Sequence, residues 1–242
     1  MVAVIEVDGV SKSFGVPVIV DMSVSVEAGD ALGIVGPNGA GKTTLLNLIA
    51  GDLAPDRGRV LLNGNDVTGV SADRRCRSGL ARTSQVPRPF EGMSVLENVL
   101  VGATYGRPEL QRESDRVDVA VDALERTGML TKANTMAGAL PLLDRKRLEL
   151  SRALATDPSV LLLDEIAGGL TEGEVAELVE LVKSIHAGGV TIVWIEHIVH
   201  ALMAVVNRIM AMSFGTKIAE GEPEAVMNSA EVREVYLGVA GE

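Results

Sequence analysis

A glycine-rich segment near the start of the chain constrains its fold more than any other feature. An apolar run, Ala31–Val35, leads into this segment, and an apolar helical pattern begins behind it at Leu45. Between them the chain reads G-x-x-x-x-G-K-T over Gly36–Thr43, the pattern of a phosphate-binding loop. Glycines allow positive φ angles and let backbone N–H groups approach phosphate oxygens closely. A strand, this loop and a helix therefore predict a site for the phosphates of a nucleotide.

The residues that follow the glycines add charge and a metal ligand. The N-terminus of the next helix supplies unpaired N–H groups and the positive end of a dipole. Lys42 can reach the β- and γ-phosphates, and the Thr43 hydroxyl can bind Mg²⁺. We expect the nucleotide to contact the consecutive residues Gly36, Pro37, Asn38, Gly39, Ala40, Gly41, Lys42, Thr43 and Thr44.

Composition narrows the class of protein further. The 242 residues are 47% apolar, which is ample for a hydrophobic core. A net charge of −11 argues against a nucleic-acid partner, because neutralising phosphates needs clusters of Lys and Arg. Cys76 is the single cysteine, which excludes an intrachain disulfide and fits a reducing compartment. We expect no signal peptide, because the N-terminal residues lack a basic region and contain the acidic Glu6. We also expect no membrane span, because no apolar run approaches about 18 residues.

The first part of the chain mixes strand patterns with a hairpin signal, Asn63-Gly64, which follows an apolar run. These pieces predict an antiparallel portion beside the central strand and helix. We expect strands over residues 2–7, 23–27, 58–67 (with the hairpin) and 81–84, and a short helix over 71–80.

The middle of the chain, residues 88–157, has no strand pattern, so we expect a helical insertion there. In its third helix, Leu143, Leu150 and Leu154 share one face. The predicted helices of this insertion cover residues 94–101, 113–126 and 144–155.

Two continuous apolar runs, 159–165 and 190–195, are typical of strands buried on both faces of a parallel sheet. A helix over 172–186 separates them, and a last helix covers 223–237. The predicted fold class is α/β, with a P-loop NTPase (RecA-like) parallel-sheet core and an antiparallel N-terminal portion. Within a single domain of residues 1–242, we expect the core in 1–87 and 158–242 and the helical subdomain in 88–157.

Two carboxylates end the first of these apolar runs. At the C-terminal end of a parallel strand, Asp164 would hold Mg²⁺ directly or through water, and Glu165 would polarise a water for attack on the γ-phosphorus. An acidic pair that caps a surface strand is a common alternative. The phosphate-binding loop upstream favours the functional interpretation.

Gln85 and His197 each end a predicted strand as well. A neutral amide can orient water or complete a Mg²⁺ shell, and an imidazole can donate a hydrogen bond to a γ-phosphate oxygen. In isolation, either residue would fit an ordinary structural role. Because the chain has no H-E-x-x-H string and no cluster of Cys or His, we expect no zinc site.

These pieces together resemble the ATP-binding subunit of an ABC transporter over nearly the whole chain. Gly36–Thr43 is similar to the Walker A loop, and Val160–Asp164 looks like Walker B. The resemblance implies Gln85 as the Q-loop glutamine, Glu165 as the catalytic glutamate and His197 as the switch histidine.

By the same resemblance, Phe14 is the aromatic residue that stacks on adenine, with a buried turn aromatic as the alternative. A small GTPase of the same loop class is disfavoured, because no N-K-x-D string appears. Some segments resemble the branched-chain amino-acid uptake group, and lipopolysaccharide-export ATPases share much of them. These segments are Ala81–Gln85, Ser94–Leu100, Arg147–Ala153 and Val235–Gly238.

The resemblance implies ATP and Mg²⁺ as cofactors and membrane permease subunits as partners. It also implies a second ABC ATPase subunit, identical or different, and indirectly a periplasmic or extracellular solute-binding protein. The chain would then be cytoplasmic and attached to the inner face of the membrane through the permease.

The pattern departs from the family at the signature segment, which we define as Leu140–Asp144. It reads L-P-L-L-D where the family has L-S-G-G-Q, and Pro141 has neither a hydroxyl nor an N–H to offer a phosphate. Lesser departures are Ile166, Gly168–Thr171 and Ile198. In the family's head-to-tail dimer this segment serves the partner's ATP, so one site of a heterodimer, or both of a homodimer, would be slow. A nucleotide-gated subunit with little turnover is the main alternative, and an ABC ATPase of translation or repair is a less favoured one.

Overall fold

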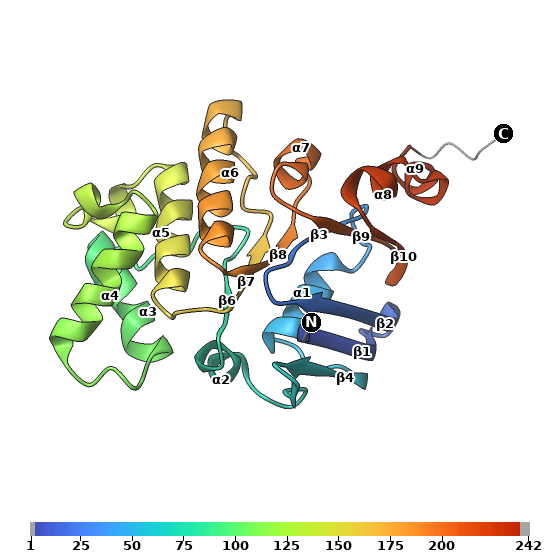
Figure 1. Ribbon diagram of the computed structural model, residues 1–242, viewed down its shortest axis with the longest axis horizontal. Coiled ribbons are helices and arrows are strands. Elements are labelled where there is room, and N and C mark those ends of the chain that lie inside the picture. Colours follow the sequence, from blue (N-terminus) through green and yellow to red (C-terminus); the bar gives the residue numbers. More distant parts are fainter. Residues whose placement is uncertain (1–2, 238–242) are drawn as a thin grey trace. The chain divides into compact units, whose positions relative to one another are not determined.

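The computed structural model describes residues 3–237, which divide into two compact units (Figure 1). The first unit comprises residues 1–72 and 191–242, and the second comprises residues 73–190. Val2, in the first predicted strand, and Gly238, in the last motif, lie outside the described residues. In the part of the chain that the structure describes, no helix combines the length and the apolar character needed to cross a membrane.

The first unit contains the antiparallel portion expected from the sequence, a sheet with the strand order β2-β1-β4-β5. Its strands are β1 (Ala3–Ser13), β2 (Pro17–Glu27), β4 (Arg57–Leu62) and β5 (Asn65–Asp66). The hairpin between β4 and β5 turns at Asn63 and Gly64, which have φ angles of 51° and 75°. Two adjacent positive φ angles are what a tight hairpin turn needs, so the Asn-Gly signal is confirmed.

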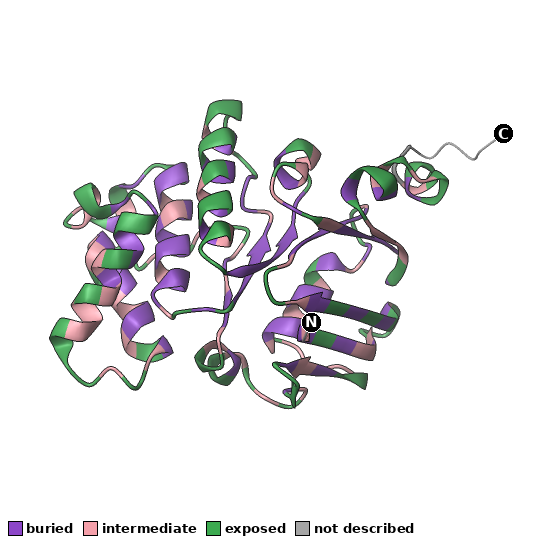
Figure 2. Ribbon diagram, in the orientation of Figure 1, coloured by how far each residue is buried: buried purple, intermediate pink, exposed green. Residues whose placement is uncertain are grey.

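A second set of strands in the first unit has the order β10-β9-β3-β8. In it β3 (Ala31–Val35) pairs in parallel with β8 (Thr191–Ile195) and with β9 (Arg208–Ser213), and β10 (Thr216–Gly221) is antiparallel to β9. Every residue of β3 and β8 is buried, as the continuous apolar runs predicted (Figure 2). The helices of this unit are α1 (Lys42–Ala50), α7 (Val199–Met203), α8 (Pro223–Asn228) and α9 (Ala230–Leu237).

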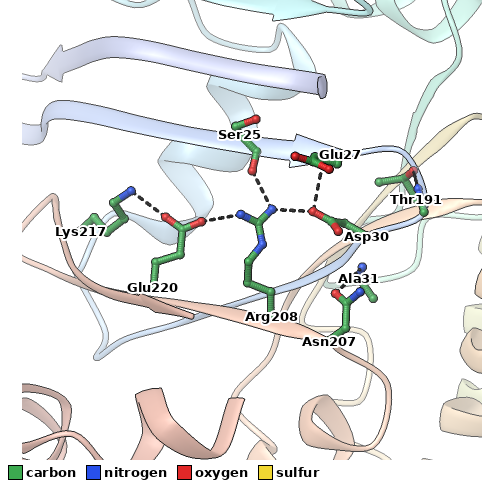
Figure 3. A network of polar contacts seen from close by, with 10 residues as sticks. Ser25, Glu27, Asp30, Ala31, Thr191, Asn207, Arg208, Lys217 and Glu220 are labelled. Carbon is green, nitrogen blue, oxygen red and sulfur yellow. Dashed lines mark hydrogen bonds and ion pairs between the residues drawn. The ribbon is translucent and has the colours of Figure 1, made fainter. Parts of the chain in front are cut away.

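A charged network fixes β9 and β10 to the end of β2 and to the turn that leads into β3 (Figure 3). The Arg208 guanidinium donates to the backbone oxygen of Ser25 at 2.7 Å and to Asp30 Oδ2 at 2.6 Å. Arg208 Nη1 donates a hydrogen bond to Glu220 Oε1 at 2.7 Å, and Lys217 Nζ donates one to Glu220 Oε2 at 2.6 Å. Satisfied in this way, the network holds the start of β3, and therefore the glycine-rich segment behind it, in a fixed register.

The second unit consists of helices and one parallel strand pair. The strands β6 (Leu80–Arg82) and β7 (Val160–Asp164) run in parallel, and Arg82 pairs with Leu162. The helices are α2 (Ala72–Arg77), α3 (Val95–Gly106), α4 (Glu113–Arg126), α5 (Leu142–Leu154) and α6 (Glu172–Ala187), with short 3₁₀ turns over Leu130–Lys132 and Ala137–Ala139.

Local sequence features begin α3 and α6 and allow α3 to pack closely against α5. Ser94 and Thr171 begin α3 and α6 with capping boxes, closed by Glu97 and Glu174. In α3, Gly102 lies against the backbone of α5, because a Cβ at this position would come 2.3 Å from the Arg152 carbonyl oxygen. The glycine therefore sets the distance between α3 and α5.

Most predicted elements exist, although several bounds shift. The strand ahead of the glycine-rich segment and α4 match their predicted bounds, whereas β2 begins before the predicted residue 23 and α5 begins before the predicted residue 144. The tail is two helices, because Ser229 has ψ 149° and interrupts them. The prediction of one continuous helix there was wrong, and α7, β9 and β10 had no counterpart in the sequence analysis.

Candidate functional site

The glycine-rich segment forms the loop between β3 and the first helix, α1, as predicted. A Cβ on Gly36 would lie 2.3 Å from the Met212 carbonyl oxygen, and one on Gly41 would lie 2.8 Å from the Val18 carbonyl oxygen. Gly41 also has φ 98°, which side chains rarely tolerate. Glycine is therefore required at both ends of the loop by close backbone contact.

Lys42 is the first residue of α1 and is almost completely buried, with 6% of its surface exposed. Its Nζ donates to the carbonyl oxygens of Gly36 at 2.7 Å and Pro37 at 3.1 Å. The glycine before it gives no side-chain cap, and the first turn of α1 carries no acid. The N-terminus of a helix favours negative charge, and a cation beside it adds to this preference, so the arrangement fits a bound anion such as a polyphosphate.

The turn between β9 and β10 supports the same loop. The Gly215 N–H donates to the Ala40 carbonyl at 3.0 Å, and the Val20 N–H donates to the Gly215 carbonyl at 3.0 Å. Nearer the start of the chain, Phe14 follows β1 and is 57% exposed, with Lys12 Nζ 5.5 Å from its ring centroid. Phe14 is therefore not a buried turn aromatic, and Lys12 covers part of its exposed ring.

His197 follows the end of β8, the strand next to β3, and its side chain is exposed. Ile34 pairs with Ile195, so the phosphate loop and His197 leave the sheet at the same edge. The buried Glu196 accepts the backbone N–H groups of His197 at 2.9 Å and Ile198 at 3.3 Å. This contact fixes the backbone that carries the imidazole.

In the second unit, the structure brings Gln85 and Glu165 together. Gln85 Nε2 lies 2.5 Å from Glu165 Oε2. Glu165 has φ 47°, an unusual backbone angle for a non-glycine residue, and such strain is concentrated at functional sites. Asp164, the last residue of β7, is buried, and its Oδ2 lies 2.9 Å from Arg82 Nη2.

Two residues of this second group were not predicted from the sequence. One is Arg82, whose signal is its position at the end of the strand beside the one that ends in Asp164. The other is Glu149 of α5, which accepts the N–H groups of Ser84 at 3.3 Å and Arg88 at 3.1 Å, on either side of Gln85. Burial raises the pKa of the Glu149 carboxyl, against the lowering effect of these hydrogen bonds.

The signature segment runs into the N-terminus of α5, where Pro141 precedes the first helical residue and gives no side-chain cap. Leu142 is exposed, and its Cδ2 lies 3.2 Å from where a Cβ on Gly169 would be. Leu143 is buried in the unit, and Asp144 is buried and paired with Lys132. The positive end of this helix therefore already has an acid in its first turn.

The residues expected to bind Mg²⁺ suit that ion. Asp164, Thr43 and Gln85 offer carboxylate, hydroxyl and amide oxygens, the hard donors that Mg²⁺ prefers. Among the described residues, no group of three or more His, Cys, Asp and Glu could hold a metal by itself.

Comparison with known proteins bears on these observations. The family model described as ABC transporter matches residues 19–168. The chain belongs to the ABC transporter family. A second model, described as branched-chain amino acid ATP-binding cassette transporter, matches residues 216–242.

Individual relatives of this ABC transporter protein match over almost its full length. The high-affinity branched-chain amino acid transport ATP-binding protein LivG of Escherichia coli (strain K12) is 36% identical over 250 residues, 98% of each chain. The lipopolysaccharide export system ATP-binding protein LptB of Acidithiobacillus ferridurans is 32% identical over 240 residues, again 98% of each. The ADP conformation of MJ1267, an ATP-binding cassette of an ABC transporter, has a TM-score of 0.89 at 31% identity and covers 99% of this chain and 100% of that one. The predicted family and fold class are confirmed.

Proposed function

We propose that this chain is the ATP-binding and ATP-hydrolysing subunit of an ABC importer for branched-chain or related amino acids. The observation that carries the nucleotide part is the buried Lys42 at the N-terminus of α1, a position that favours an anion. The likeness to LivG and the match of residues 216–242 support the substrate class. The likeness to LptB supports an exporter less strongly, because the identity is lower.

In this proposal the phosphate loop, Gly36–Thr44, holds the phosphates, and Phe14 stacks on the base. Thr43, Gln85 and Asp164 hold Mg²⁺, which would neutralise charge that develops on the phosphates. Glu165 accepts a proton from the attacking water, and His197 donates a hydrogen bond to a γ-phosphate oxygen.

The permease partner would bind to the exposed apolar residues that follow Gln85. Val86, Phe90 and Met93 are exposed, and the Arg152 guanidinium lies 5.5 Å from the Phe90 ring centroid. Several large exposed apolar side chains within one short segment are typical of a protein interface. Residues 88–157 would then form the helical subdomain that reports the nucleotide state to the permease, at the inner face of the membrane. A second ABC ATPase chain would complete the assembly, with a solute-binding protein on the far side.

A nucleotide-gated subunit with little turnover of its own is the second candidate. The N-terminus of α5 supports it, since Pro141 offers no donor and Asp144 brings negative charge to the first turn. Losing a donor to transition-state charge lowers a rate by on the order of 10²-fold.

The test is steady-state phosphate release in the presence of the cognate permease and ATPase subunits. We expect Glu165→Gln to lower release by about 10²-fold or more, the usual contribution of a positioned base, while ATP binding is retained. Glu172→Gln, an exposed glutamate of α6, is the matched control and should release phosphate at the wild-type rate. Equal release by wild type and Glu165→Gln would refute hydrolysis. Dimerisation that depends on ATP but proceeds without turnover would favour the second candidate.

A further inference from the structure

Asp164, the proposed magnesium ligand, is already engaged by an arginine of the neighbouring strand. Arg82 Nη2 lies 2.9 Å from Asp164 Oδ2, and only 5% of the aspartate side chain and 22% of the arginine side chain are exposed. Little water screens an ion pair of this kind, so each charge stabilises the other more than on an open surface.

The strand register makes this pairing a built feature. Arg82 is the last residue of β6 and pairs with Leu162 of β7, and the Thr83 N–H continues the ladder to the Leu162 carbonyl at 3.0 Å. Both partners of the ion pair therefore come from adjacent, hydrogen-bonded strands. A short way along the chain, Gln85 bonds Glu165, so consecutive carboxylates each have a partner from the β6 side.

We infer that Arg82 is a positioning residue that competes with Mg²⁺ for Asp164. This rests on the proposed function, because it takes Asp164 as a magnesium ligand. A guanidinium and a divalent cation on one buried carboxylate would lie a few ångströms apart and repel each other. Binding of the metal nucleotide is then an exchange of counter-ions, in which Arg82 withdraws from Asp164. Without the metal, Arg82 keeps the buried carboxylate neutralised and oriented.

The experiment titrates ADP into the full chain, first in excess EDTA and then at a series of free Mg²⁺ concentrations, by calorimetry. For Arg82→Ala we expect unchanged ADP affinity in EDTA. We expect the half-saturating free Mg²⁺ to fall about three- to tenfold, somewhat more than an exposed ion pair would contribute. Arg77→Ala removes an exposed ion pair with Asp73 and is the matched control that should leave both values unchanged.

A second comparison separates this exchange from a merely structural ion pair. In an Asp164→Asn background, Arg82→Ala should no longer shift the Mg²⁺ dependence, because the two substitutions remove the same interaction. Arg82→Gln, which keeps a neutral donor, gives the same test if Arg82→Ala does not fold. An unchanged or raised half-saturating Mg²⁺, or weaker ADP binding in EDTA, would overturn the inference. If the wild type binds no ADP with Mg²⁺ present, the proposed function itself fails.

Discussion

The N-termini of α1 and α5 both lack a side-chain cap and differ in charge. Each follows a loop, and neither has a side-chain cap, since Gly41 precedes one and Pro141 the other. The first turn of α1 contains no acid and begins with the buried Lys42, whereas that of α5 contains Asp144, paired with Lys132. The first turn of α1 therefore begins with a cation, whereas that of α5 carries an acid.

This difference shows that a helix N-terminus is an anion site only if its surroundings leave the charge available. At α5 the negative charge of Asp144 in the first turn interacts favourably with the helix dipole and stabilises the helix. Pro141, just before the helix, has no backbone N–H to donate. At α1 no acid in the first turn opposes an anion, and Lys42 adds a positive charge beside it.

Replacing Lys42 by alanine should abolish most of the nucleotide affinity. We expect ATP to bind about 10³-fold more weakly, because a preorganised cationic donor is lost. The free energy of unfolding should change by less than about 1 kcal/mol, since two lost hydrogen bonds are offset by removal of a buried charge. Calorimetric titration and urea unfolding measure the two quantities. Lys183→Ala, at an exposed lysine of α6, is the control and should change neither the ATP affinity nor the free energy of unfolding. A Lys42→Ala variant that binds ATP normally but unfolds more readily would contradict the proposed role of Lys42.

Two glycines of the same loop separate backbone conformation from contact. Gly41→Ala should lower the free energy of unfolding by about 3 kcal/mol, because the left-handed φ is strained and the Cβ meets the Val18 carbonyl oxygen at 2.8 Å. Gly39→Ala should cost only about 1 kcal/mol, since its φ is 82° but nothing lies within 4 Å of the added Cβ. Thermal and urea unfolding of the two variants give the comparison, and equal losses would mean that the contact at Gly41 is relieved by relaxation.

At α5 the substitution Asp144→Asn, unlike Lys42→Ala, should lower the stability of the chain and leave its ATP affinity unchanged. We expect unfolding to become easier by about 1–2 kcal/mol, because the ion pair with Lys132 and the favourable charge at the helix N-terminus are both lost. The affinity of the chain for ATP should stay at the wild-type value. Asp118→Asn, on α4, is a suitable control for the loss of one exposed acid. A variant as stable as the wild type would show that Asp144 does not balance the helix.

The sequence predicts those elements whose conformation is determined by residues close together in the chain. The loop glycines, the Asn63-Gly64 turn and the apolar runs that become β3 and β8 each act through their own backbone or burial. The strand β10 has a mixed pattern that predicts no buried strand, whereas β9 was missed although its residues 209–213 are buried like those of β3 and β8. Arg208 joins these strands to residues far apart in the chain.

At the candidate site, residue types were predictable and their partners were not. The motif named Asp164, Glu165 and Gln85, but the contact of Arg82 with Asp164 depends on the pairing of β6 with β7. Glu149 lies far along the chain from the backbone groups that it accepts, so no local pattern could identify it.

The two hydrogen bonds of Glu149 have a mechanical consequence. They anchor α5 to the chain just before Gln85, at Ser84, and just after it, at Arg88. A shift of this segment would therefore pull on α5 through these two bonds. Since α5 begins at Leu142, the bonds connect the neighbours of the glutamine that contacts Glu165 with the helix that begins in the signature segment.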